Sequence, residues 1–142
     1  MDALSPEYLA ELGRQLATIA AFLGGFSITF FGTLLTLKST SRLVSWALGA
    51  TAVAAGSFVV TVIAITTLVT SQHPNAPPSL TLSSNTPERA AMVTEWSLVL
   101  GTLGLLVSLA ISGWIHSRGV GIVTTLTSVL SAVFIFWAFS GF

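Results

Sequence analysis

Four long runs without a charged residue divide this chain. They cover residues 16–37, 44–69, 96–115 and 120–139. About 20 consecutive apolar residues in an α-helix cross the hydrocarbon core of a bilayer. Only 7% of all residues are charged, against about 25% in an ordinary soluble domain. The sequence therefore predicts an all-α membrane protein in which four transmembrane helices form an antiparallel bundle, one domain spanning residues 1–142.

The first helix is predicted to begin well before its apolar run. Ser5, Pro6 and Glu7 match an N-cap, a first helical position and an acid at the positive end of the helix dipole. A helix over 6–37 would be about 48 Å long at about 1.5 Å per residue. Because this exceeds the hydrocarbon core, we expect the first helix to extend beyond the bilayer. The acidic start is also unlike a signal peptide, so we expect the helix to be retained.

The connections differ in length. Residues 38–42 and 116–119 are short basic turns, whereas loop 71–87 is long and rich in Pro, Ser, Asn and Thr. Prolines at this density exclude a helix. A loop of this length is typically functional or disordered, which makes 71–87 a candidate contact for a partner protein.

Basic residues give a prediction of topology. Lys38, Arg42 and Arg118 lie on the side of the short turns, whereas Arg14 and Arg89 lie on the side of the termini. Cytoplasmic loops carry an excess of Lys and Arg. We therefore expect a multi-pass protein of the cell membrane with both termini on one side, and the charge count favours the extracytoplasmic side.

Several classes of function are disfavoured. The four apolar runs contain no Asp, Glu, Lys, Arg, His, Asn or Gln, and the chain has no Cys. Proton relays and ion-coupled transporters place ionisable groups at membrane depth, and intramembrane hydrolysis requires a base or a metal. A formal net charge of zero leaves no basic surface for nucleic acid. We expect no enzyme activity, no cofactor and no metal site.

The first helix carries a continuous polar and small-residue stripe at steps of three and four. Its members are Glu7, Glu11, Arg14, Thr18, Phe22, Gly25, Thr29, Gly32, Thr33 and Thr36. Residues at this spacing share one helical face. The other face is expected to carry the larger apolar side chains Leu16, Ile19, Leu23, Phe26, Phe30 and Leu34.

Two interpretations of the stripe remain open. Small residues allow a neighbouring helix to approach closely. Alternatively, the stripe faces water on the axis of an oligomer, where Phe22 would form an apolar constriction that gates by dewetting. In that case Glu11 and Arg14 would form a ring at the mouth. The candidate pore-lining residues are Glu11, Arg14, Thr18, Phe22, Gly25, Thr29 and Thr33.

The other three helices also carry small-residue faces, which we interpret as close helix contacts. They are Ala47, Ala50, Ala54, Ser57 and Thr61 on the second helix, Ser97, Gly101, Gly104, Ser108 and Ser112 on the third, and Gly121, Thr124, Ser128 and Ser131 on the fourth. These faces are more numerous than one four-helix monomer needs. They therefore favour a homo-oligomer within the lipid bilayer.

Glu95 is the carboxylate closest to the third apolar run, and Trp96 beside it is typical of a membrane interface. One interpretation is an interfacial helix end in which Glu95 pairs with Arg14 or Arg89. The other is a ligand or cation site at Glu95.

The segment Ala21-Phe22-Leu23-Gly24-Gly25-Phe26-Ser27 resembles the start of the pore helix in Orai-type calcium channels. There, an Ala-x-Leu-x-Gly-Phe run opens the first of four spans, which lines the pore of a ring. The resemblance implies pore positions at Thr18, Phe22, Phe26, Thr29 and Thr33. Thr33 stands where that family has its filter glutamate, so calcium selectivity is not implied. The family also keeps its termini in the cytoplasm, contrary to the charge count here.

These observations favour a small, self-associating membrane protein that forms a passive pore or channel-like assembly lined by the first helix. The alternative is a non-conducting scaffold or regulatory subunit that binds a partner protein through loop 71–87 or through the charged N-terminal turn. A small transporter is a third possibility, although it lacks a polar site at the bilayer midplane.

Overall fold

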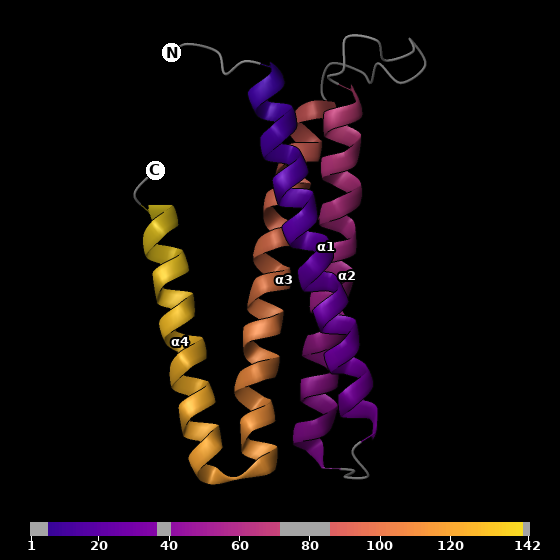
Figure 1. The fold of residues 1–142 in the computed structure, drawn as a ribbon. Helices are drawn as coiled ribbons and strands as arrows, with labels where there is room; N and C mark the ends of the chain where they lie inside the picture. The colour runs from indigo at the N-terminus through magenta and orange to yellow at the C-terminus, as the bar shows by residue number, and fades with distance from the viewer. Residues whose placement is uncertain (1–5, 37–40, 72–85, 141–142) are drawn as a thin grey trace.

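The computed structural model describes residues 6–36, 41–71 and 86–140. These residues form four α-helices, α1 (Pro6–Thr36), α2 (Arg42–Ser71), α3 (Thr86–His116) and α4 (Arg118–Ser140). Successive helices run antiparallel, so that the N-terminus of α1 and the C-terminus of α4 lie toward the same end (Figure 1). The predicted all-α fold with four helices is confirmed.

α2 and α4 match the second and fourth apolar runs closely, whereas α1 and α3 each begin about ten residues before their apolar runs. α1 begins at Pro6, as its opening residues predict, and α3 begins at Thr86. α1 is about 46 Å long at about 1.5 Å per residue, longer than a hydrocarbon core of about 30 Å. α2 and α3, with 30 and 31 residues, are as long as α1. The distinctive helix is α4, which has only 23 residues.

The connections are shorter than predicted where the structure describes them. Between α3 and α4 only Ser117 lies outside a helix, and its hydroxyl accepts a hydrogen bond from the Val120 amide at 3.3 Å. Ser41 caps α2 in the same way, through the Val44 amide at 3.4 Å. Both serines are therefore N-caps that allow a sharp reversal. Residues 37–40 and 72–85, which include nearly all of loop 71–87, lie outside the described residues.

The main contacts between helices follow chain order, α1 on α2, α2 on α3 and α3 on α4. Figure 1 shows α4 beside α3 and separated from α1. The core consists of Ala20, Ala54 and Phe58, each with 0% of its surface exposed. Only 11% of the α4 span is buried, against 28% of the α2 span, so α4 is the peripheral helix.

The interface between α2 and α3 confirms the predicted small-residue faces. The hydroxyls of Thr51 and Ser108 form a hydrogen bond, and both lie within reach of the Ala47 carbonyl oxygen, at 2.7 and 3.1 Å. A second pair, Thr61 and Ser97, forms a hydroxyl–hydroxyl bond of 2.7 Å. Hydroxyls satisfied in this way can be buried without the cost of an unpaired polar group.

The interface between α3 and α4 also uses small residues, as predicted. A Cβ placed on Gly121 would come within 2.6 Å of the Trp114 ring, so the ring lies directly on the backbone of α4. The Trp114 Nε1 donates a hydrogen bond of 3.0 Å to the Thr125 hydroxyl. Ser128 is buried farther along this face. α4 is thus attached to α3 by close backbone approach and by an indole hydrogen bond.

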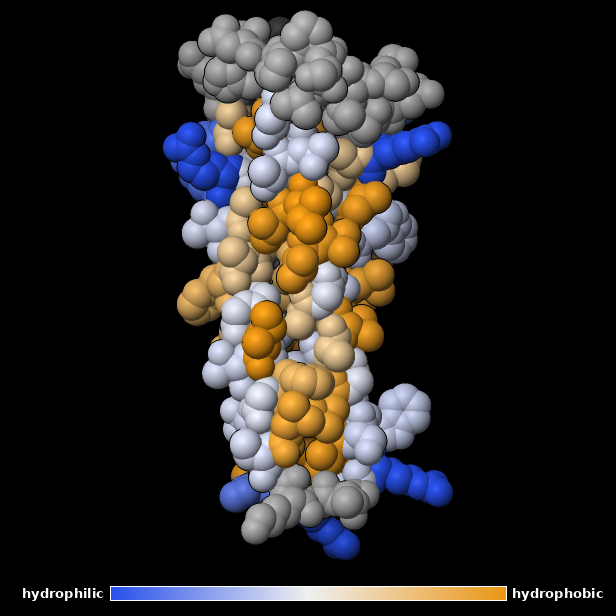
Figure 2. Space-filling view, turned by 90° about the vertical axis from the view of Figure 1, so that its right-hand side faces the viewer, coloured by the Kyte–Doolittle hydropathy of each residue, from blue (hydrophilic) through white to orange (hydrophobic). Residues whose placement is uncertain are grey.

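All four helices are long and apolar enough to cross a membrane, and the chain is a multi-pass membrane protein. The candidate spans are Ala10–Thr36, Arg42–Thr70, Glu88–His116 and Arg118–Trp137. Figure 2 shows strongly hydrophilic residues gathered toward the two ends, with apolar and weakly polar side chains between them. Four exposed tryptophans near the span ends match the expected aromatic belts. They are Trp46, Trp96, Trp114 and Trp137.

Candidate functional site

α1 has two faces, and the stripe predicted from the sequence is the one turned away from the protein. Every described side chain of the stripe from Glu11 to Thr36 is exposed. Phe22 is the most prominent, with 75% of its surface exposed. The side chain of Glu7 lies outside the described set. None of the other helices that the structure describes buries a residue of this face.

The face of α1 that packs on α2 differs from the predicted one. The predicted apolar face is mixed, because Leu34 is buried and Leu16, Leu23 and Phe30 are half-buried, whereas Ile19 and Phe26 are exposed. The fully buried positions are instead Gly13, Ala20, Gly24, Ser27 and Leu34. These positions lie on the side of the helix opposite the stripe, since an α-helix turns by about 100° per residue.

Close backbone approach explains this choice of face. A Cβ on Gly13 would lie 2.6 Å from Val69 Cγ2, and one on Gly24 would lie 3.3 Å from Phe58 Cβ. This packing face was not predicted from the sequence. Its signature is the seven-residue spacing of Gly13, Ala20 and Ser27, which keeps small residues along one helix–helix seam.

The glycines of the stripe have the opposite environment. No atom lies within 4 Å of a Cβ built on Gly25 or on Gly32. The neighbouring threonines satisfy their own donors, because Thr29 donates to the Gly25 carbonyl at 3.0 Å and Thr33 to the Thr29 carbonyl at 3.0 Å. The stripe is therefore an open surface of small side chains and hydroxyl oxygens along a membrane helix.

The charged end of the stripe forms its own local pair. Arg14 Nη1 lies 3.7 Å from Glu11 Oε2, one turn apart on α1, with both side chains largely exposed. Gln15 Nε2 also donates to Glu11 Oε1 at 3.4 Å. The pairing of Arg14 with Glu95 that the sequence suggested is thus wrong. An exposed pair of this kind adds little stability.

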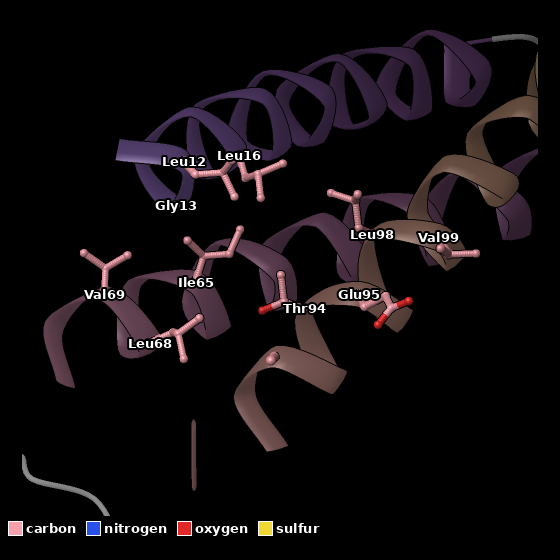
Figure 3. A pocket seen from close by; sticks show the side chains of 11 residues that line it. Leu12, Gly13, Leu16, Ile65, Leu68, Val69, Thr94, Glu95, Leu98 and Val99 are labelled. Atoms are coloured by element: carbon pink, nitrogen blue, oxygen red, sulfur yellow. The ribbon is translucent and has the colours of Figure 1, made fainter. Parts of the chain in front are cut away.

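Glu95 lies on α3 at the edge of two apolar cavities. The first, of about 310 Å³, lies among α1, α2 and α3. Figure 3 shows Glu95 at the edge of this group of side chains, beside Thr94 and Leu98 of its own helix. The second, of about 250 Å³, lies between α3 and α4. Among the residues that the structure describes, Glu95 forms no ion pair and accepts no hydrogen bond, so neither suggested arginine neutralises it.

The candidate residues therefore belong to two separate sites. The seven pore candidates share one exposed face of α1, whereas Glu95 lies on α3. Within residues 6–36, 41–71 and 86–140, no three His, Asp or Glu side chains lie close enough to hold a metal ion. Most of loop 71–87, the predicted contact for a partner protein, lies outside this part of the chain.

No family model, curated protein or solved structure matches this chain. The similarity of residues 21–27 to the first helix of Orai-type channels therefore remains a likeness of seven residues. Functional inference rests on the geometry of α1 and α3.

Proposed function

We propose that this chain is a self-associating protein of the cell membrane that forms a passive pore, with α1 nearest the axis. The observation that carries the proposal is the exposed stripe of α1, which runs from Glu11 to Thr36 and is not covered by α2, α3 or α4 as described here. Several copies arranged with this face inward would enclose hydroxyl oxygens and glycine backbone. The other helices would separate this lining from lipid.

The chemistry of the stripe supports a pore more than a lipid-facing surface. A helix surface facing acyl chains gains from large apolar side chains, whereas Gly25 and Gly32 leave open space beside the backbone. The Thr29 and Thr33 protons are used within the helix, which leaves oxygen lone pairs to accept hydrogen bonds from water. Such a lining conducts without strong ligation of an ion.

Phe22 and the charged end have distinct roles in this proposal. Phe22 projects from the stripe with 75% of its surface exposed, and a ring of such side chains would form an apolar constriction. Glu11 and Arg14, two to three turns nearer the N-terminus, would surround the mouth and favour ions according to the balance of their charges. Flow would be passive, because the stripe between Thr18 and Thr36 contains no ionisable side chain.

The direct test is current through a planar bilayer that contains the purified full-length protein. Phe22→Ala should raise single-channel conductance by widening the constriction, and Thr29→Glu should shift selectivity toward cations. Phe134→Ala is the matched control, because Phe134 is the same residue type, is 65% exposed against 75% for Phe22, and lies on α4, away from α1. Its currents should equal those of the unmodified protein.

Two results would contradict the pore. One is a folded protein that never conducts. The other is a current that responds to Phe22→Ala no more than it responds to Phe134→Ala. Either result would leave a non-conducting scaffold as the better explanation of the same surfaces.

A further inference from the structure

The cavity between α3 and α4 combines a carboxylate with aromatic rings. It is lined by Glu95 and Trp96 from α3 and by Phe136 from α4, and its other lining residues are aliphatic apart from Thr102. It adjoins a second, more open hollow that shares Leu103, Ala132 and Phe136. From Glu95 to Leu103 the groove follows α3 for about 12 Å at about 1.5 Å per residue. The result is a slot that is apolar along its length and anionic at one end.

The depth at which Glu95 would lie in the membrane gives its charge a role in binding. It lies about 32 Å along α3 from His116, at about 1.5 Å per residue, and a hydrocarbon core is about 30 Å thick. With the basic residues at the end of α3 placed at one membrane surface, Glu95 lies at the opposite boundary of the core. No described residue pairs with it. A carboxylate at this depth without a counter-charge favours a cation that arrives from the membrane.

We propose that Glu95 is the anionic end of a binding site for a lipophilic cation, an ammonium group attached directly to an apolar body. The cation would lie beside the Glu95 carboxylate and the Trp96 ring, and the apolar body would lie in the groove between α3 and α4. Trp96 and Phe136 are 67% and 77% exposed, so their faces are available for cation–π contact. The site does not depend on the proposed pore, which uses the far face of α1.

The order of charges along α3 argues against a phospholipid as the occupant. Arg89 is exposed and lies six residues nearer the N-terminus than Glu95, which places it about 9 Å farther out at about 1.5 Å per residue. A zwitterionic phospholipid carries its phosphate next to the glycerol and its ammonium group beyond it. Its phosphate would therefore lie at the level of Glu95, which has the same sign of charge, and its ammonium group would lie farther out, away from the Glu95 carboxylate. A cation joined directly to its apolar body has no such conflict.

The test is titration of octyltrimethylammonium into full-length protein in phosphatidylcholine nanodiscs, measured by calorimetry and corrected with empty nanodiscs. The unmodified protein should bind it saturably. Glu95→Gln keeps the shape of the side chain and removes the charge, and it should weaken binding at least tenfold. Glu88→Gln is the matched control, because Glu88 is an exposed carboxylate of the same helix that lines neither cavity. It should leave binding unchanged.

Two further measurements separate this site from simple partition or self-association. Uncharged octanol and anionic octyl sulfate should not compete with the cation for the site. Ala132→Phe, which fills the groove, should abolish binding while the protein keeps its size and thermal unfolding profile. Equal binding by the Glu95→Gln protein, or equal competition by octanol, would overturn the proposal. If Ala132→Phe changes the number of subunits and leaves cation binding intact, the groove is an interface between copies and the proposal fails.

Discussion

Gly101 of α3 lies against the ring of Phe58 of α2, so closely that a Cβ on Gly101 would come within 2.9 Å of Phe58 Cε1. Phe58 is the largest fully buried side chain. On its other side it packs near Gly24 of α1, where an added Cβ would lie 3.3 Å from Phe58 Cβ. One aromatic residue thus lies between a glycine of α1 and a glycine of α3. This junction of three helices is the structural centre of the protein.

Gly101→Ala should destabilise the fold, because the clash of its methyl group should cost about 1–3 kcal/mol, the usual cost of overpacking a filled core. The Phe58 ring would have to move and has no exposed space into which to move. Alanine stabilises a helix relative to glycine by about 1 kcal/mol. The measured loss of stability will therefore be smaller than the cost of the clash. Unfolding in mixed micelles with increasing denaturing detergent would measure it.

The control for this prediction is Gly56→Ala on α2, where no atom lies within 4 Å of the added Cβ. It should be neutral or slightly stabilising. Equal stabilities for the two variants would show that the Phe58 junction tolerates an extra methyl group and is not tightly packed.

The hydroxyl pair Thr61–Ser97 should couple α2 to α3. The hydrogen bond between the two hydroxyls is 2.7 Å long, and the Thr61 hydroxyl also donates to the Ser57 carbonyl oxygen at 2.9 Å. A double-mutant cycle with Thr61→Val and Ser97→Ala should give an interaction of about 0.6 kcal/mol, the average for hydrogen bonds between membrane helices. Additive effects of the two single changes would contradict the coupling.

Cysteine cross-linking should report whether the α1 stripe faces a second copy. The chain contains no Cys, so a single introduced thiol has no competitor. Under mild oxidation Thr29→Cys should give a disulfide-linked dimer, because α1 helices around an axis bring equivalent positions near each other. Disulfides require Cα atoms about 4.4–6.8 Å apart, so the measurement is specific for close approach.

Phe134→Cys on α4 provides the comparison, since it is exposed to a similar degree as Phe22 but lies on another helix. It should remain monomeric under the same oxidation. Cross-linking at Phe134→Cys together with none at Thr29→Cys would place the subunit contact on α4 and remove α1 from the axis.

Introduced cysteines can also be used to determine the membrane topology. If the basic residues at the short turns are cytoplasmic, Ser117→Cys should react with a membrane-impermeant maleimide only after the cells are permeabilised. Glu88→Cys, at the opposite end of α3, should react in intact cells. The reverse pattern would place both termini in the cytoplasm.

The sequence alone was sufficient for the helices, for the α2–α3 faces and for the α4 side of the α3–α4 interface, but it did not predict that Trp114 of α3 packs on α4. Uncharged runs of bilayer length can satisfy their backbone groups in lipid only as helices or as closed barrels, and their length and composition favoured helices. Small residues at Ser97, Gly101 and Ser108 occur on one face of α3, so the packed side was readable from spacing. That Glu95 has no partner among the described residues could not be predicted from the sequence, because it depends on where Arg14 and Arg89 lie in three dimensions.

Only the tertiary structure decided which face of α1 meets the protein. α1 has small residues on both sides, Gly13, Ala20 and Gly24 on one and Gly25 and Gly32 on the other. In a water-soluble protein, hydropathy would identify the face of a helix that points inward. In a membrane, lipid and the protein interior are both apolar, so hydropathy does not distinguish a lipid-facing side from a buried one. The choice came from shape, because Val69 and Phe58 of α2 leave room for glycine at Gly13 and Gly24. That same choice left the hydroxyl stripe of α1 facing outward.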